Sequence, residues 1–131
     1  MSRTKFVLVV MLAIFLASSG CGNDTRLLSV QIYPSDPNLA HSTSFYIAPG
    51  TAIQFQIQGW YSNRTVQTIA ASSGKWSSTN ASVAGVDASG LAMSAGPVGV
   101  TTIVVTVSGH TSSVPLAVCD PSVVVCPPPP G

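Results

Sequence analysis

The fold of this chain is decided by one stretch, WSSTNASVAGVDASGL, which runs from Trp76 to Leu91. It predicts a strand that opens at Trp76, whose side chain we expect between two sheets, followed by a short apolar segment at Val83–Val86. The segment Asp87–Gly90 then supplies a tight turn, because glycine tolerates the positive φ that such a turn requires. We expect Asp87 to order this turn and Leu91 to begin the return strand.

Period-2 alternation extends in both directions from this unit. The clearest case is residues 52–58, where Ile53, Phe55 and Ile57 alternate with glutamines, so one face is buried and the other faces water. Within Val100–Val107 the β-branched side chains also divide between two faces. The remaining strand signals are Leu28–Tyr33, Phe45–Ile47, Val66–Ala70 and Ser113–Val118. About eight short strands without an amphipathic helix predict an all-β sandwich.

Two features of these strands lead to specific expectations. Pro115 cannot donate to a ladder, so we expect it at a sheet edge or a bulge. Residues 59–65 predict a hairpin-like bend that carries Trp60 and Tyr61, which we take as the candidate contact surface because loop aromatics anchor sugars and proteins. The alternative is that one of the two packs inside and the other covers the edge of the sandwich.

Several segments, in this order, resemble bacterial immunoglobulin-like domains of group 2. The segments are Pro49–Thr51 with Gln54–Gln56, residues 59–68, Trp76–Asn80, Val83–Asp87, Ser89–Leu91 and Gly99–Val105. The resemblance covers roughly residues 28–118 and implies an immunoglobulin-like β-sandwich of seven to eight antiparallel strands. Such domains occur in bacterial surface proteins, including intimin- and invasin-like adhesins, where many copies form stalks. This chain carries a single copy.

The first twenty residues have the layout of an export signal. A short basic head at Arg3 and Lys5 precedes the apolar run Phe6–Ala17, which is too short to span a bilayer as a helix. Small residues then lead to Cys21 in a pattern that resembles the bacterial lipobox. We therefore expect acylation of Cys21 and attachment to a membrane. The alternative is an ordinary secretory signal that leaves Cys21 as a plain thiol.

The three cysteines fit this interpretation. Acylation of Cys21 leaves Cys119 and Cys126 as an even pair, which predicts a disulfide in an exported protein. A zinc site built from these two cysteines and the histidines is less favoured, because the cysteine spacing is wide. The predicted organisation is a signal peptide at 1–20, a tether at 21–27, the sandwich at 28–118 and a Cys/Pro-rich tail at 119–131.

Charge and residue types exclude several function classes. The chain has five basic and four acidic residues, and two of the basic ones lie in the signal, so the rest offers no basic patch for nucleic acid. His41 and His110 are the neutral-pH bases, both in turn-like settings, and the aspartates are scattered. We expect no catalytic residue, metal or cofactor.

The sequence therefore predicts a non-catalytic, lipid-anchored module of the bacterial cell envelope. Its expected role is adhesion or protein–protein interaction with a protein or glycan ligand. The alternative is a purely structural spacer or accessory subunit of an envelope assembly.

Overall fold

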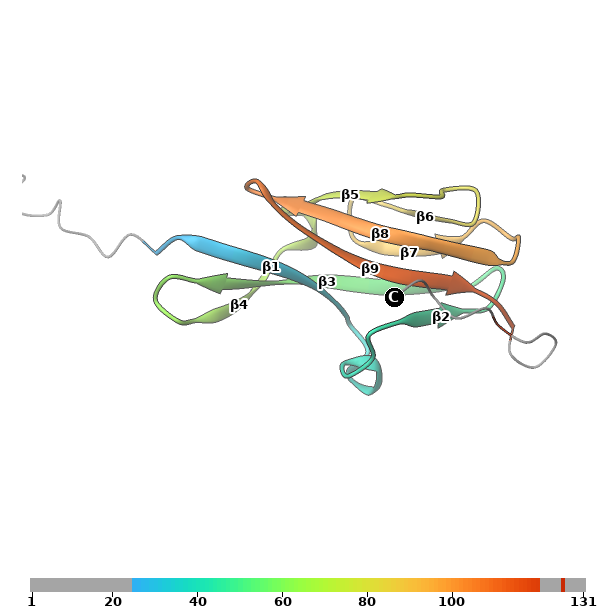
Figure 1. Cartoon of the computed structure of the whole chain (residues 1–131), viewed down its shortest axis with the longest axis horizontal. Helices are drawn as coiled ribbons and strands as arrows, with labels where there is room; N and C mark the ends of the chain where they lie inside the picture. The colour runs from blue at the N-terminus through green and yellow to red at the C-terminus, as the bar shows by residue number, and fades with distance from the viewer. Residues whose placement is uncertain (1–24, 121–125, 127–131) are drawn as a thin grey trace, which may run out of the picture.

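The computed structural model describes residues 25–120 and residue 126. The predicted signal peptide at 1–20, Cys21, the first part of the tether and residues 127–131 lie outside the described residues. The described chain is all-β, as predicted, and its strands form two sheets (Figure 1). The strands are β1 (Leu27–Pro34), β2 (Phe45–Ile47), β3 (Ala52–Tyr61), β4 (Val66–Ile69), β5 (Lys75–Ser78), β6 (Ala84–Val86), β7 (Leu91–Ser94), β8 (Gly99–Val107) and β9 (His110–Val118), with 3-10 turns η2 (Pro37–Leu39) and η3 (Ala71–Ser73).

The first sheet is organised around β3, its longest strand. One edge of β3 pairs antiparallel with β1, from Tyr61 opposite Leu27 to Phe55 opposite Pro34. The other edge is shared in tandem, because β4 pairs with residues 57–60 and β7 pairs with residues 52–54. β6 then pairs with β7 and completes five strands. A ten-residue strand is long enough to template both partners end to end.

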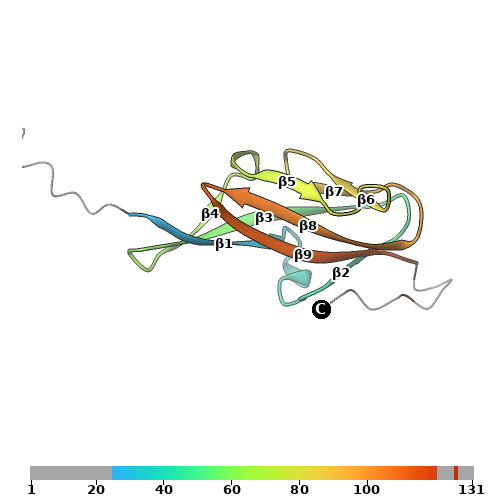
Figure 2. The ribbon, with the colours of Figure 1, turned by 45° about the horizontal axis from the view of Figure 1, so that its top comes forward.

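The second sheet has the order β2-β9-β8-β5 and faces the first sheet (Figure 2). β8 and β9 form a hairpin through Ser108 and Gly109, both at positive φ. β2 pairs parallel with β9, with Phe45 opposite Leu116. The expectation of wholly antiparallel pairing is therefore wrong for β2. After β1 the chain crosses from the first sheet to the second, and a crossing of this kind lets β2 join β9 without a hairpin.

Pro115 lies in β9, which is a central strand. It stands opposite Thr102 on β8 and one residue before the segment of β9 that pairs with β2. Pairing with β2 therefore does not require the N–H that proline lacks. Pro115 therefore lies in a part of β9 that pairs with β8 on one side but not with β2 on the other, although β9 is an interior strand of its sheet.

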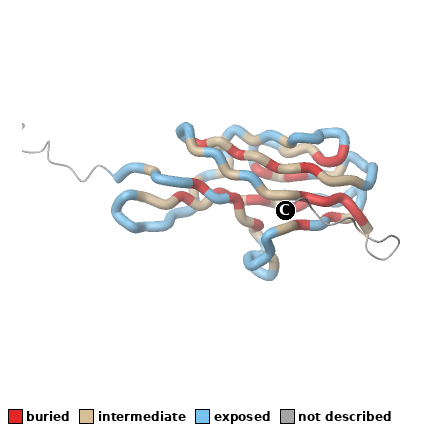
Figure 3. Tube along the Cα trace, in the orientation of Figure 1, coloured by how far each residue is buried: buried red, intermediate tan, exposed pale blue. Residues whose placement is uncertain are grey.

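The core lies between the sheets and follows the predicted alternation. Ile53, Phe55 and Ile57 are buried, while the glutamines between them are half-buried, and Figure 3 shows the same alternation along β8. Phe45 from the second sheet packs edge-to-face on Phe55 from the first, with ring centroids 5.3 Å apart. The buried cluster comprises Val30, Ile32, Phe45, Ile47, Ile53, Phe55, Ile57, Val83, Ala84, Ala92, Ile103, Val105, Val107, Leu116 and Val118.

The turn at Asp87–Gly90 has the predicted form. Oδ1 of Asp87 accepts hydrogen bonds from the backbone N–H and hydroxyl of Ser89 and from the backbone N–H of Leu91, at 2.6–3.0 Å. The Ser89 hydroxyl, then the Leu91 N–H, hold the pKa of the Asp87 carboxyl below its ordinary value. Gly90 has φ of 79°. Trp76 packs partly buried against the core, and its Nε1–H donates to the carbonyl of Ala71 at 2.8 Å.

A chain of hydrogen bonds joins the two sheets near the link between β5 and β6. The hydroxyl of Ser78 on β5 donates to the carbonyl of Ala84 on β6 at 2.6 Å, so its lone pairs remain for the hydroxyl of Thr101 on β8, 2.7 Å away. Thr101 Oγ1 in turn accepts from the backbone N–H of Asn80 at 2.9 Å. Thr101 is 3 % exposed and points inward with Ile103. The chain satisfies polar groups that the packed interface hides from water.

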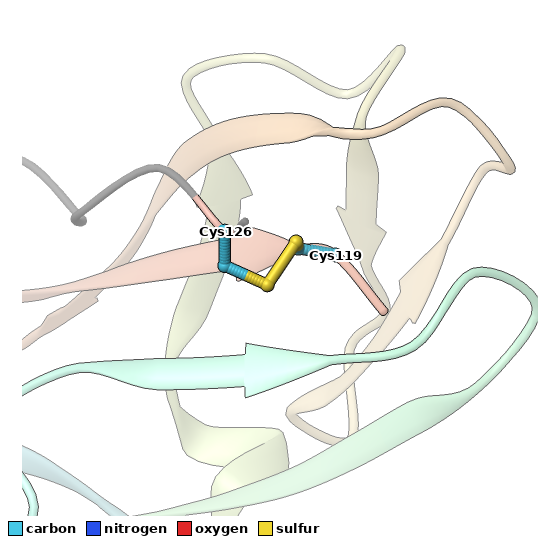
Figure 4. The surroundings of a disulfide bond; sticks show 2 residues. All are labelled: Cys119 and Cys126. Carbon is cyan, nitrogen blue, oxygen red and sulfur yellow. A yellow bond between two sulfur atoms is a disulfide. The ribbon is translucent and has the colours of Figure 1, made fainter. Parts of the chain in front are cut away.

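The predicted disulfide between Cys119 and Cys126 is present (Figure 4). The Cα atoms are 5.6 Å apart, and Cys119 is fully buried. The backbone N–H of Cys119 donates to the carbonyl of Ile47, which fixes the end of β2 beside the disulfide. All nine strands and the whole core cluster lie within residues 27–118, so the fragment 22–131 contains the complete described domain and its disulfide.

Candidate ligand-binding surfaces

Trp60 and Tyr61 lie at the end of β3 and not in the bend, because β3 extends three residues further than the sequence indicates. Consecutive residues of a strand point to opposite faces. Trp60 lies on the same face of the strand as the half-buried Gln58. Tyr61 lies on the inward face, as Gly59 does. Both rings are half-buried. The structure therefore places the two aromatic side chains on different surfaces.

The face that carries Trp60 is the outer face of the first sheet, which we call the neutral face. Cross-strand partners share a face, so the register defines its members. They are Ser29, Gln31 and Tyr33 on β1, Ala52, Gln54, Gln56, Gln58 and Trp60 on β3, Val66 and Thr68 on β4, Gly85 on β6, and Leu91 and Met93 on β7. None of these residues is charged.

The aromatic groups on the neutral face are held in place. The hydroxyl of Tyr33 donates to Oε1 of Gln56 at 2.6 Å and lies 3.1 Å from the hydroxyl of Thr68. Trp60 lies between Ser29 and Val66 in the register, and Val66 is 48 % exposed. The neutral face thus combines an ordered tyrosine, a tryptophan and amide groups.

A cleft of about 560 Å³ opens where the chain crosses between the sheets. Three separate segments line it, namely residues 35–39 after β1, residues 46–48 at the end of β2, and residues 51–54 at the start of β3. Its apolar lining comes from Leu39, Ile47 and Ile53. Tyr46 alternates with the buried Phe45 and Ile47 and is 46 % exposed. The volume falls in the range of roughly 300–1,000 Å³ that small-molecule sites occupy.

The polar groups of this cleft are mostly fixed by local hydrogen bonds. Oδ1 of Asp36 accepts from the backbone N–H and the side-chain amide of Asn38, both at 2.9 Å, and Oδ2 takes no part in these bonds. The hydroxyl of Thr51 donates to the carbonyl of Ala48 at 2.6 Å. Ser35 differs, because its Oγ is the one buried side-chain polar atom of the described residues that has no hydrogen-bond partner.

The described histidines and carboxylates do not gather into a site. His41 is exposed in the loop after η2, and His110 is the first residue of β9 and half-exposed. Within residues 25–120 and 126, no group of three His, Cys, Asp or Glu residues is placed to hold a metal ion. The same residues contain no helix with the length and hydropathy needed to cross a bilayer.

Sequence reasoning missed Tyr33, Tyr46 and Ser35 as candidate site residues. Tyr46 had a usable signal, since it stands between two apolar residues of a short strand and must point away from them. The cleft itself had none, because its three walls meet only after the chain has crossed between sheets. Neither the family models nor the curated proteins compared with this chain match it.

Proposed function

We propose that this protein is a non-catalytic, lipid-anchored, immunoglobulin-like module of the bacterial cell envelope that binds another protein through the neutral face. The observation that carries the binding role is the absence of charge across the described outer face of a five-stranded sheet that also bears Trp60 and Tyr33. The cores of protein interfaces are depleted of charged residues and enriched in aromatic ones.

The rigidity of the face supports the same role. The hydrogen bonds of Tyr33 to Gln56 and Thr68 hold that ring before any partner arrives, so less conformational entropy is lost on binding. Met93 and Val66 add exposed apolar area on either side, at 55 % and 48 % exposure. Val66 lies opposite Trp60 and Met93 opposite Ala52, so apolar contact area is present at both ends of the face.

Anchoring is proposed from the sequence around Cys21, which precedes the first described strand by six residues. The test is mass spectrometry of the protein from the membrane fraction. We expect a diacylglyceryl mass on Cys21 and loss of membrane association in Cys21→Ala. A mature N-terminus upstream of Cys21 without acyl mass would contradict this part of the proposal.

Binding is tested by placing a photo-crosslinking amino acid at one position of the full-length protein in living cells. Thr68 lies on the neutral face, and Thr106 on the outer face of the other sheet is the matched control. We expect one defined protein adduct from position 68, none from position 106, and loss of the adduct when Trp60→Ala is added to a protein that still folds. Equal adducts at both positions, or none, favour the alternative role of a spacer.

A further inference from the structure

We propose that the cleft between residues 35–39, 46–48 and 51–54 is a binding site for one uncharged hexopyranose unit, such as the end of a neutral glycan. The cleft shares only Ala52 and Gln54 with the neutral face, and the inference does not rest on the function proposed above. Trp60 lies at the opposite end of β3 from Ile53, a separation of about 20 Å along the strand. Ligand binding in the cleft can therefore be distinguished from contact at the neutral face.

The first argument is the charge of the lining. Among the residues that line the cleft, Asp36 is the only ionisable acid, and there is no Lys, Arg or His. A carboxylate without a basic partner disfavours a phosphate, a uronate or another anion, because like charges repel. The remaining polar groups are hydroxyls and an amide, from Ser35, Tyr46, Thr51 and Gln54. This set suits a neutral ligand rich in hydroxyl groups, each of which both donates and accepts.

The second argument is the combination of an apolar platform with fixed acceptors. The exposed ring of Tyr46 offers an apolar surface at the cleft, and a pyranose ring presents a matching C–H face. Oδ1 of Asp36 is held by two bonds from Asn38, so the carboxylate is already oriented and Oδ2 remains for ligand hydroxyls. Preorganised groups of this kind lose little entropy when a ligand binds.

The third argument is Ser35. A buried polar group without a partner is costly in a folded protein and calls for an explanation. Ser35 lines the cleft, its backbone N–H donates to the carbonyl of Gln54 at 2.9 Å, and its Oγ makes no bond within the described protein. Serine has three staggered χ1 rotamers, and the inference requires that one of the other two presents this hydroxyl to the cleft. A ligand hydroxyl would then provide the missing partner.

The walls of the cleft are tied to the sheets. The backbone N–H of Thr51 donates to the carbonyl of Ala48 at 3.1 Å and closes the turn between β2 and β3. The carbonyl of Ile47 accepts from Cys119, next to the disulfide. The amide of Gln54 donates to the carbonyls of Phe55 and Ser89. The cleft is therefore part of the rigid framework, which a site for a small ligand requires.

The test is an NMR titration of the ¹⁵N-labelled fragment 22–131 with four probes: methyl α-glucopyranoside, methyl α-mannopyranoside, methyl β-galactopyranoside and N-acetylglucosamine. For a ligand of this size we expect a dissociation constant on the order of a millimolar for at least one probe. Its shift changes should centre on Ser35, Asp36 and Tyr46, and glucuronate should bind several-fold more weakly.

Three variants separate binding from folding. We expect Tyr46→Ala to abolish detectable binding and Asp36→Asn to weaken it about 10-fold. Ser35→Ala should weaken binding by about 2- to 10-fold, as expected for one lost hydrogen bond. It should leave the unfolding midpoint unchanged or higher, since an unpartnered hydroxyl is removed. The control Thr106→Val lies outside the cleft and should bind as wild type.

Three results would overturn the inference. One is the absence of shift changes with all four probes up to 50 mM, about fifty times the expected constant. Another is shift changes that centre on Trp60, which would place sugar binding on the neutral face. The third is a clear loss of stability in Ser35→Ala, which would show that the hydroxyl serves the fold.

Discussion

Replacement of Thr101 by Val tests whether the hydroxyl chain between the sheets holds the sandwich closed. The two side chains have nearly the same shape, so the change removes the hydroxyl and leaves the volume of this buried side chain nearly unchanged. Thr101 Oγ1 accepts from the backbone N–H of Asn80 at 2.9 Å and bonds to Ser78 Oγ at 2.7 Å, and the side chain is 3 % exposed. Both partners would lose this oxygen at once, as would the hydroxyl of Thr79, which lies 3.5 Å from it.

The magnitude follows from those contacts. Each lost hydrogen bond contributes about 0.5–1.5 kcal/mol, and a buried group left unpaired costs about 1–3 kcal/mol. Ser78 keeps its bond to Ala84, and the N–H of Asn80 retains a longer contact with Ser78 Oγ at 3.3 Å, which limits the loss. We therefore expect Thr101→Val to lower the free energy of unfolding by about 2 kcal/mol. For a domain of this size the melting temperature should fall by about 8–16 °C.

The assay is urea unfolding of the fragment 22–131, with circular dichroism and tryptophan fluorescence as the two signals that report unfolding. The matched control is Thr106→Val on the same strand, whose hydroxyl contacts Thr111 at the exposed face, and its change should stay within about 0.5 kcal/mol. Thr101→Ser keeps the hydroxyl and loses one methyl group, so we expect a cost of about 1 kcal/mol. If Thr101→Val is as stable as Thr106→Val, the chain of hydroxyls does not hold the sheets together.

Three further changes are predicted. Gly90→Ala should lower the free energy of unfolding by about 2–4 kcal/mol, because the φ of Gly90 is 79° and the new Cβ would lie 2.7 Å from a backbone oxygen of β3. Gly50→Ala, at φ 80° with open space around the new Cβ, should lower it by about 1–2 kcal/mol. Equal urea midpoints for the two variants would contradict the steric argument. Cys126→Ser should lower the free energy of unfolding by at most about 2.5 kcal/mol, because the disulfide joins residues seven apart and closes a small loop. Cys119 remains buried as an apolar thiol in this variant. A loss above about 4 kcal/mol would mean that the disulfide does more than close this loop. Asp87→Asn should be less stable than wild type at pH 5 and above, and the difference in stability should shrink as the pH falls below about 4. The reason is that a carboxyl group whose pKa is lowered by folding adds stability that disappears when the group is protonated. A difference that does not change with pH would show that the charge of Asp87 plays no part.

The alternation of β3 could be predicted from sequence because it is a local signal. Ile53, Phe55 and Ile57 alternate with glutamines, and a period of two permits only one buried face. The Asp87–Gly90 turn was equally accessible, since each residue acts on its own neighbours. Local chemistry of this kind is independent of where the rest of the chain lies.

The parallel pairing of β2 could not be predicted in the same way. Phe45–Ile47 is three residues long, and its partner Leu116–Val118 lies about seventy positions further along the chain. No property of either segment specifies the direction of the other. The length of the link between β1 and β2, and the crossing between sheets that it makes, decides the direction.

The candidate site shows the same division. Trp60 could be picked out because an aromatic residue near a predicted bend is a simple signal. The strand, however, continues through Tyr61, so the two neighbouring side chains point to opposite faces of the sheet. Thr101 was hidden within a β-branched run, where its hydroxyl looks like any other threonine. Its role depends on Ser78 and Asn80, which reach it only through the pairing of β5 with β8.

The position of β1 has a mechanical consequence. β1 begins next to the first described residue and ends directly before Ser35, which lines the cleft, and Figure 1 shows the strand and the loop that follows it. If the chain is anchored through Cys21 and a ligand is held in the cleft, as proposed above, a pull between the two acts along β1. The bonds of its antiparallel ladder to β3 run perpendicular to that direction. Where the ligand is held by residues 51–54 at the start of β3, these bonds would be loaded together in shear rather than opened one by one.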